Sequence, residues 1–546
     1  MDSSRQSLPE EEGASMDRNL PNSLHVGYWA GLKPNHPAII DAETGAITTF
    51  AEYERGSNRV AHLMRKLGLK PGDQTVLMVE NRPEFLVWFW GMIRAGLRVT
   101  PVSTHARPEE IDYIIRDCGA DLFLSSGQNA EMAARCDLSA IPPAARLMAD
   151  IPMDGFTSFD AALEGLPETP IDDEVEGIEM LYSSGTTGRP KGIRKPMPAG
   201  PFGEGGAMLR YFAREWHFDA DTIYLHPAPL YHAAPLRFAN RINRLGGTVI
   251  LMRKFDPEAC LANIEKYGVT HSQWVPTHFN RLLKLPGEIR AKYDHSTMKC
   301  AIHAAAPCPH DVKRAMIEWW GPILIEYYGA SEGIGHCAIT SAEWLEKPGS
   351  VGQAKMGRLH ICGDDGEELP VGQAGTIYFE GGGSFAYHND PAKTEGAKHP
   401  KGWCTIGDVG YVDEDGYLFL TDRKAFMIIS GGVNIYPQEI EEHLLKHPKV
   451  ADAAVFGIPN ADYGEEVKAV VQLKDGQTGS DALSSEIIEF CRATLNHVKC
   501  PRSVDFIDVM PRGENGKLYK KTLLDPYWKG RKRTPADAIG EKGGAA

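Results

Sequence analysis

The sequence predicts an α/β protein with at least two domains. At 546 residues, the chain is too long to fold around a single hydrophobic core. From Ile47 to about Ser126, short β-rich runs alternate with helical segments, which is the pattern of βαβ units. After Phe426 the composition changes, and residues 427–528 have the size of a small domain. We therefore expect a large N-terminal domain at 23–422 and a small C-terminal domain after it.

The chain ends and the bulk composition exclude several classes of protein. Residues 1–22 lack the apolar segment of a secretory signal, and we expect flexible tails at 1–22 and 529–546. The most apolar run, Phe85–Ile93, is too short to span a membrane and predicts a buried helix. A net charge of −15 argues against a nucleic-acid binder. Ten cysteines without a Cys-x-x-Cys pair indicate neither zinc nor disulfides, and favour reduced thiols in the cytoplasm.

The N-terminal part predicts strands and helices in alternation. Residues 73–79 read as a strand, the segment after Pro83 as a helix, and residues 95–101 as a turn that enters the next strand. Residues 127–175 are rich in Ala, Pro and acidic side chains, which suggests variable surface structure. A strand at 178–182 then leads into a loop of glycines and hydroxyl side chains.

The elements after this loop follow a similar order. We expect a helix after the segment 228–235, and strands at 269–276, 299–303 and 325–328. Asp415-Gly416 lies between two alternating runs and predicts a β-hairpin.

The segment Leu181-Tyr-Ser-Ser-Gly-Thr-Thr-Gly-Arg-Pro-Lys-Gly192 has the composition of a phosphate-binding loop. Its hydroxyl side chains and glycines can surround phosphate oxygens with O–H and backbone N–H donors, and Lys191 adds positive charge. The pattern Gly-x4-Gly-Lys-[Ser/Thr] of the common NTPases is missing, so a different nucleotide chemistry is indicated. The alternative is a solvent-exposed linker.

This segment closely resembles the AMP-binding signature of the adenylate-forming superfamily, which includes acyl-CoA and aryl-CoA synthetases, luciferases and the adenylation domains of peptide synthetases. The resemblance implies an N-terminal domain of βαβ-rich subdomains with a β-barrel-like part, and a small mobile α+β C-terminal domain. It also implies that the loop binds ATP. The residues concerned are Ser183, Ser184, Gly185, Thr186, Thr187, Gly188 and Lys191.

A second segment, around Tyr328, has side chains that suit ATP activation. The ring of Tyr328 can cover a purine, and Gly329 permits a sharp turn. Ser331 offers a hydroxyl to a phosphate, and Glu332 offers a hard oxygen ligand to Mg²⁺. The family pattern is Tyr-Gly-x-Thr-Glu, with Ser331 here in place of Thr. The structural alternative is that Glu332 caps the following turn.

The corner Ala304–Pro307 matches a segment that is usually Gly-Gly-Ala-Pro in the family and touches the adenine and the acyl chain. Because Ala304 and Ala305 replace glycines, we expect the same backbone path with less space beside it. The further nucleotide contacts that the resemblance implies are Ala305, Ala306, Pro307 and Ala330.

The resemblance assigns the ribose to Asp408, with Arg423 assisting from the next strand. A carboxylate suits a diol because it can accept hydrogen bonds from two hydroxyls. Residues 423–426 are the expected hinge between the domains. Most relatives carry Asp or Lys at the position of Ala425, which follows Lys424, so the identity of the hinge residue stays open.

The C-terminal part supplies the expected CoA site. The glycine pair in Ser430-Gly431-Gly432 allows another chain to pass close to the backbone, as a pantetheine channel requires, although a routine turn before the helix at Pro437 has the same composition. By resemblance, these three residues bind CoA.

A lysine near the C-terminus is the expected mobile catalytic cation. Family members carry Pro-Arg-x-x-x-Gly-Lys, whose lysine, here Lys517, contacts the carboxylate and the α-phosphate. An exposed surface lysine is the alternative, and it is the role that we expect for Lys520 and Lys521.

His232 ends a Pro-Leu-Tyr-His segment that resembles the family segment beside the acyl carboxylate, so it is the candidate for orienting that group. A core histidine is the alternative. We expect Arg237 and Arg241, one turn apart on the next helix, to face solvent or pair with acids. If one points inward, it could anchor a polar group of the acyl substrate.

Together, these matches predict an acyl-CoA synthetase that uses ATP, Mg²⁺ and CoA, with Lys517, Glu332 and His232 in catalytic roles. A medium or long aliphatic or bulky alicyclic acid is favoured, with an aryl acid as the alternative. Transfer to a carrier protein, oxidation of the adenylate, a non-catalytic adenylate-binding protein and a homodimer remain open alternatives.

Overall fold

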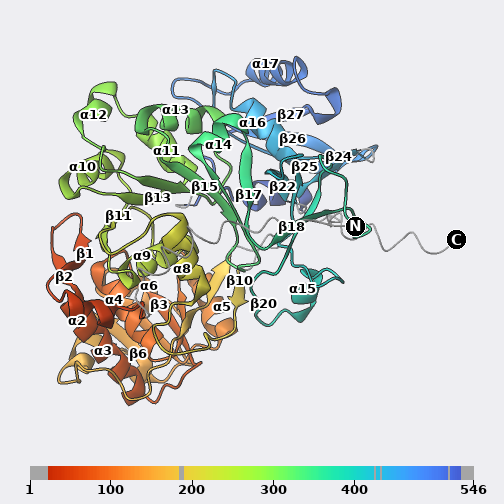
Figure 1. Cartoon of the computed structure of the whole chain (residues 1–546). Coiled ribbons are helices and arrows are strands. Elements are labelled where there is room, and N and C mark those ends of the chain that lie inside the picture. The colour runs from red at the N-terminus through yellow and green to blue at the C-terminus, as the bar shows by residue number, and fades with distance from the viewer. Residues whose placement is uncertain (1–22, 184–189, 424–425, 431–432, 514–516, 530–546) are drawn as a thin grey trace, which may run out of the picture.

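The computed structural model describes residues 23–183, 190–423, 426–430, 433–513 and 517–529. In Figure 1, the N-terminal elements lie at the lower left, the longest sheet crosses the centre, and the C-terminal elements lie at the upper right. The chain is thus a mixed α/β protein with a separate C-terminal region, and the predicted fold class is confirmed. The two expected tails lie almost wholly outside the described residues.

The N-terminal βαβ units form a parallel sheet in the order β7-β6-β5-β3-β4-β8. The strands predicted at 73–79 and 95–101 are β3 and β4, and helix α4 connects them. Every residue of α4 from Phe85 to Arg94 is buried, because this helix is apolar on almost all faces. The elements are α2 (Val26–Leu32), α3 (Phe50–Lys66), β3 (Gln74–Met78), α4 (Pro83–Arg94), β4 (Arg98–Pro101), α5 (Pro108–Cys118), β5 (Leu122–Ser126), α6 (Ala130–Ala134), β6 (Arg146–Ala149), β7 (Thr157–Ser158), α7 (Phe159–Leu163) and β8 (Ile178–Glu179).

The central sheet has thirteen strands among the described residues, in the order β18-β19-β21-β22-β17-β16-β15-β14-β13-β11-β12-β1-β2. The neighbours β1, β12, β11, β13, β14 and β15 pair parallel. The neighbours β15, β16, β17, β22, β21, β19 and β18 pair antiparallel. The antiparallel strands have a hydrophobic core of their own.

The strands of this sheet are β1 (Pro37–Asp41), β2 (Ile47–Thr49), β11 (Ile223–His226), β12 (Thr248–Leu251), β13 (His271–Trp274), β14 (Cys300–His303), β15 (Leu324–Gly329), β16 (His336–Thr340), β17 (Ser350–Met356), β18 (Arg358–Cys362), β19 (Gly375–Glu380), β21 (Asp408–Val412) and β22 (Leu418–Arg423). Its helices are α8 (Gly206–Glu215), α9 (Ala233–Arg244), α10 (Pro257–Tyr267), α11 (Pro276–Leu283), α12 (Gly287–Lys292), α13 (His310–Trp320) and α14 (Ser341–Glu346).

Two smaller sheets complete the fold. Strands β9 (Leu181–Ser183), β10 (Lys191–Arg194) and β20 (Ala386–Tyr387) form one of them, next to α15 (Pro391–Gly396). The C-terminal sheet has its own core and consists of β23 (Ile428–Ser430), β24 (Val433–Ile435), β25 (Val450–Asn460), β26 (Gly464–Leu473) and β27 (Ser503–Ile507), with helices α16 (Pro437–Leu444), α17 (Asp481–Arg492) and α18 (Lys520–Leu524). Pro437 is the first residue of α16, as predicted.

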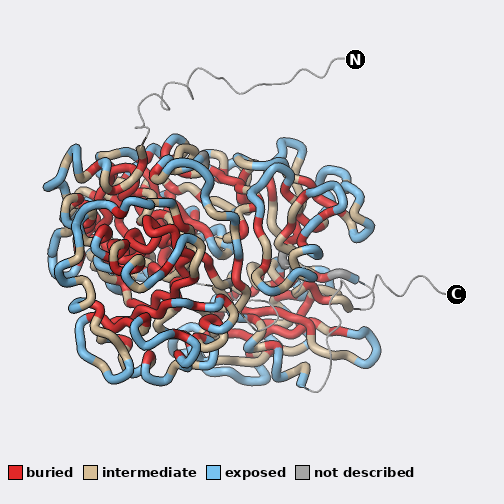
Figure 2. The backbone as a smooth tube through the Cα atoms, turned by 90° about the horizontal axis from the view of Figure 1, so that it is seen from below, coloured by how far each residue is buried: buried red, intermediate tan, exposed pale blue. Residues whose placement is uncertain are grey.

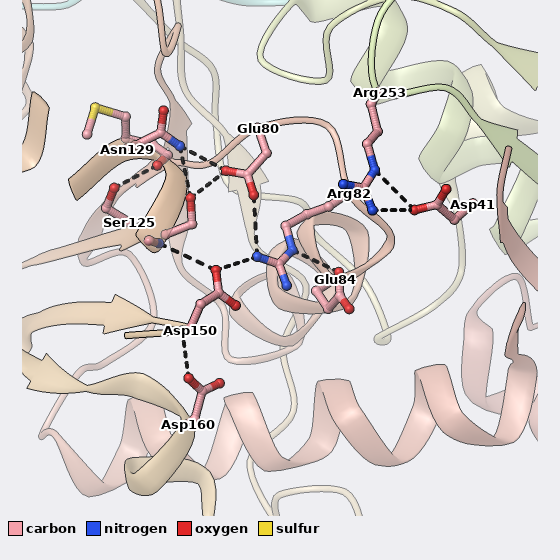
Figure 3. Close-up of polar contacts among 12 residues, drawn as sticks. Asp41, Glu80, Arg82, Glu84, Ser125, Asn129, Asp150, Asp160 and Arg253 are labelled. Carbon is pink, nitrogen blue, oxygen red and sulfur yellow. Dashed lines mark hydrogen bonds and ion pairs between the residues drawn. The ribbon is translucent and has the colours of Figure 1, made fainter. Parts of the chain in front are cut away.

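The loop after β3 connects the N-terminal sheet to the central sheet. Arg82 lies between the carboxylates of Glu80, Glu84 and Asp150, as Figure 3 shows. The adjacent Asn81 is buried, and its amide donates to the carbonyl oxygens of Ala228 and Met252 at 2.8 and 3.1 Å and accepts from Leu230 N at 2.7 Å. These bonds position the segment that leads into α9.

Burial follows the sheets. Figure 2 shows buried backbone inside the molecule and exposed loops around it. None of the helices in the described ranges has the length and apolar composition needed to cross a bilayer. All ten cysteines are unpaired.

Candidate active site

One cavity of about 2970 Å³ brings together predicted site residues from distant parts of the chain. Glu332 follows β15, Asp408 begins β21, His232 precedes α9, and Lys517 belongs to the C-terminal region. All four line this cavity. The adenylate hypothesis requires Glu332 and Asp408 to face the same space, and they do.

The phosphate loop connects two antiparallel strands. Lys191 at the start of β10 pairs with Ser183 at the end of β9. The predicted residues Ser184 to Gly188 lie outside the described part of the chain. The side chain of Lys191 contacts that of Lys393 on α15, and burial followed by this contact lowers the pKa of Lys393. Two adjacent ammonium groups repel each other unless an anion lies between them, so this pair is suited to a phosphate.

Glu332 is buried beside this lysine pair. The hydroxyl of Tyr387 on β20 donates a hydrogen bond of 2.9 Å to Glu332 Oε1. Neither Lys393 nor Tyr387 could be predicted, because a lone lysine on a short helix and a tyrosine in a short strand carry no recognisable signal. Within the described ranges, no group of three or more acidic, His or Cys side chains could hold a metal ion without other ligands.

Asp408 and Tyr328 form the nucleoside end of the cavity. The Tyr328 hydroxyl donates to Asp408 Oδ2 at 2.8 Å. Asp408 pairs with Arg423 across β21 and β22, so these two residues are neighbours as expected; the side chain of Arg423 is not among the described ones. Gly329, Ala330, Ser331, Ala305, Ala306 and Pro307 line the same cavity.

Ala305 has a backbone conformation that glycine adopts readily. Its φ is 78°, in the left-handed region that an alanine rarely adopts. Ala305 lines the cavity, and the narrower space beside it stays a prediction.

His232 and Lys517 meet at another part of the cavity. His232 is the N-cap residue of α9, and burial, with a further contribution from the charge of Lys517, lowers the pKa of His232 to about 4. The imidazole is therefore neutral at pH 7. Lys517 closes a backbone turn through a bond of 2.9 Å from Gly513 N to its carbonyl oxygen. The turn predicted at 514–516 lies outside the described residues.

Helix α9 carries three arginines with different surroundings. Arg237 pairs with Glu179 at 2.7 Å, and Arg244 pairs with Glu176 at 2.6 Å. Arg241 has neither a hydrogen bond nor an ion pair among the described residues, and its guanidinium instead lies 4.2 Å from the ring centre of Phe212. The expectation that the predicted arginines face solvent or pair with acids is thus correct for Arg237 and wrong for Arg241, which lines the cavity.

In the C-terminal region, the expectation for Lys520 is wrong. Lys520 is not a surface lysine: it is buried and pairs with Glu441 at 2.8 Å, because α18 turns it toward the C-terminal sheet. Lys521 pairs with Asp525 at the edge of the same helix. Ser430 ends β23 and is half-buried, whereas the hinge residues Lys424 and Ala425 and the glycines Gly431 and Gly432 lie outside the described residues.

Comparisons with known proteins agree with this geometry. The family model of the AMP-binding enzyme matches residues 28–386, and that of the AMP-binding enzyme C-terminal domain matches residues 439–517. A feruloyl-CoA synthase of an Amycolatopsis species is 32% identical over 91% of this chain and 97% of its own length. The long-chain-fatty-acid–CoA ligase FadD13 of Mycobacterium tuberculosis is 28% identical over 91% of this chain and 97% of its own.

Among solved structures, ATP-bound MatB from Rhodopseudomonas palustris is 29% identical and superposes with a TM-score of 0.79 over 93% of this chain and all of MatB. The apo form of MatB superposes with a TM-score of 0.68 at 28% identity over the same shares of both chains. The motifs, the cavity and these matches lead to one conclusion: the chain belongs to the adenylate-forming superfamily of AMP-binding enzymes, as an enzyme of the acid–thiol ligase class.

Proposed function

We propose that this enzyme joins a carboxylic acid to CoA in two steps. The carboxylate first attacks the α-phosphate of ATP, forming acyl-AMP and releasing pyrophosphate. The CoA thiolate then attacks the acyl carbon and expels AMP, a far better leaving group than the oxide that a bare carboxylate would have to lose. The observation that carries this proposal is that Lys517, His232, Glu332 and Asp408 line one cavity.

The arrangement of charges suits the first step. Lys517 lies close enough to His232 to lower its pKa, and a cation there would hold two anions, the carboxylate and the α-phosphate, in reach of each other. Neutral His232 orients the carboxylate as a hydrogen-bond donor. Lys191 and Lys393 would bind the phosphates that leave, and Asp408 would accept the ribose hydroxyls.

Glu332 fits the Mg²⁺ that ATP chemistry needs. Mg²⁺ is usually held by one or two carboxylates together with substrate phosphates, which matches a lone buried carboxylate beside a phosphate-binding lysine pair. When bound, the ion would neutralise charge on the phosphates. Tyr387 keeps Glu332 pointing toward this space.

The second step requires a movement that we assign to the C-terminal region. We propose domains at 23–422 and 427–528, joined by a hinge at 423–426, with rotation that withdraws Lys517 and presents Ser430 to Gly432 to the pantetheine of CoA. The better superposition on ATP-bound than on apo MatB supports the interpretation that the described arrangement belongs to the first step.

The acid and the acceptor are the finer parts of the proposal. We favour a medium or long aliphatic or bulky alicyclic acid, with an aryl acid as competitor, because both feruloyl-CoA synthase and a long-chain ligase are among the relatives. One relative from Streptomyces coeruleorubidus is named a fatty acid–[acyl-carrier-protein] ligase, at 29% identity. Measuring whether free CoA is consumed separates the two acceptors. The unpaired cysteines support a reducing compartment such as the cytoplasm.

Separating the two half-reactions tests the proposal. In Lys517→Ala, acyl-AMP formation, followed as pyrophosphate release with a panel of acids, should fall by roughly 100- to 1000-fold, because a charge at the reacting groups is lost. Thioester formation from supplied acyl-AMP should be largely retained. The matched control is Lys449→Ala, which removes a lysine of the C-terminal region that pairs with Glu486 at 2.7 Å and is not among the residues that line the cavity. Loss of both half-reactions in a folded Lys517→Ala variant contradicts the assignment.

A further inference from the structure

Arg241 is a half-buried cation at the wall of the cavity that the proposed mechanism does not use. Its guanidinium lies over the rings of Phe212 and Phe238, at 4.2 and 5.4 Å from their centres, and has no carboxylate partner among the described residues. Burial, followed by the nearby charge of Arg237, lowers the pKa of Arg241 to about 10, so it is still charged at pH 7. A charge removed from bulk water without a partner is costly, and a partner from outside the protein would offset that cost.

The surroundings contain more positive than negative charge. Lys195, Arg237 and Arg241 influence one another, and burial together with Arg237 lowers the pKa of Lys195 to about 8. Glu179 is the carboxylate that lies among these three cations, and it pairs with Arg237. The other nearby carboxylate, Glu332, is the proposed Mg²⁺ ligand. An excess of cations therefore faces the cavity.

Buried polar atoms without hydrogen-bond partners occur in the same part of the protein. These atoms are Asn240 Oδ1, Gln273 Oε1 and His336 Nε2, and all three residues line the cavity. Burial and the charge of Arg241 lower the pKa of His336 to about 3, so its ring is neutral. A wall for a purely hydrocarbon chain would leave these atoms unsatisfied, whereas a polar group, with the water it carries, would satisfy them.

Helix α9 sets the distance between this place and the reacting carboxylate. His232, at the N-terminus of α9, marks the reacting end of the acid, and Arg241 is nine positions further along the chain. A rise of 1.5 Å per residue separates their backbones by about 14 Å along the helix axis, and the arginine side chain leans back toward the N-terminus, which shortens the distance to roughly 8–13 Å. A medium-length acid spans such a distance.

We propose that Arg241 binds a second carboxylate, at the end of the acid remote from the carboxylate that becomes adenylated. The substrate class is therefore a medium-length dicarboxylic acid. This inference rests on the proposed ligase function and refines its choice of acid. We assign the phosphates of ATP to Lys191 on β10 and Lys393 on α15, neither of which belongs to α9.

The test compares dicarboxylic acids with their ω-methyl monoesters of equal chain length, which keep the size and remove the second charge. Pyrophosphate release by the full-length enzyme should show kcat/KM roughly 100-fold higher for the best diacid than for its monoester. In Arg241→Met this preference should collapse, mainly through a raised KM for the diacid, and Arg241→Lys should restore part of it. The matched control is Arg314→Met, an exposed arginine on α13, which should keep the preference.

Each outcome discriminates. Equal kcat/KM for diacid and monoester in the unmodified enzyme overturns the inference. This comparison needs no variant, so it remains valid even if Arg241→Met does not fold. An equal loss for both acids in Arg241→Met also overturns it, since a merely structural arginine would act in that way. If none of the acids tested leads to pyrophosphate release, the proposed ligase function itself is contradicted.

Discussion

Ala305 carries its left-handed backbone at a position where the resemblance implies glycine. A side chain at φ 78° strains the loop, and removing it should relieve that strain. We expect Ala305→Gly to raise the free energy of unfolding by about 0.5–1 kcal/mol.

Urea unfolding at pH 7 measures this change, and Ala304→Gly is the matched control. Ala304 is buried and has no positive φ, so losing its methyl group should destabilise the fold. If both variants lower stability equally, the strain at Ala305 is absent.

Single residues also mark where sequence reasoning ends. The resemblance carried by Tyr328, Glu332, Asp408 and Lys517 was sufficient to predict that they face one space, and all four line one cavity. The partner of a lysine is not encoded locally. Nothing near Lys520 indicates that it is buried against Glu441, since that contact depends on how α18 packs on α16.

The segment that carries His232 and leads into α9 is held by a residue of another sheet connection, Asn81. Three hydrogen bonds of the Asn81 side-chain amide hold Ala228 and Leu230, which precede α9, and Met252, which follows β12. Asn81→Ala should lower the free energy of unfolding by about 2–3 kcal/mol, because buried backbone groups lose their partners. It should also lower kcat for pyrophosphate release, since His232 would be less well positioned. Urea unfolding and a steady-state assay measure both effects, and an unchanged kcat in a destabilised variant would show that Asn81 does not position the site.

Elements were the most predictable level of the fold. The apolar run in α4, the strands β3 and β4, and the hairpin at Asp415-Gly416 follow from local pattern and turn chemistry. Their arrangement does not, because a strand of similar composition can occupy any place in a sheet. The antiparallel strands that extend the central sheet could not be ordered from the sequence.

For the whole molecule, buried neutral histidines predict sensitivity to acid. Burial is the main cause that lowers the pKa of each from 6.5, to about 3 or 4 in most cases; they are His226, His271, His278, His303 and His336. Since each folded pKa lies below the unfolded value, the unfolded chain binds protons that the folded chain excludes. Stability is therefore complete above pH 6.5 and falls as the pH drops toward 4, by up to about 1.4 kcal/mol per imidazole and pH unit.

Free energies of unfolding in urea at pH 7, 6 and 5 measure this loss of stability. This pH interval lies above the range in which carboxylates titrate. The ring centres of His278 and Phe255 lie 4.0 Å apart in a stacked arrangement, so His278→Phe keeps the packing. This variant should reduce the pH dependence of the free energy of unfolding by the contribution of one imidazole. A stability that is equal at pH 7 and pH 5 contradicts this prediction.

The sequence by itself determined the family and the α/β class, and it predicted Glu332, Asp408, His232 and Lys517, which line one cavity. It could do so because these groups lie in short segments whose chemistry depends on neighbouring residues. Only the tertiary structure decided that Lys393 lies against Lys191, that Lys520 is buried, and that Arg241, unlike Arg237 and Arg244 of the same helix, has no carboxylate partner among the described residues. Charge balance in a cavity is the sum over side chains from distant segments, so it exists only after the chain has folded.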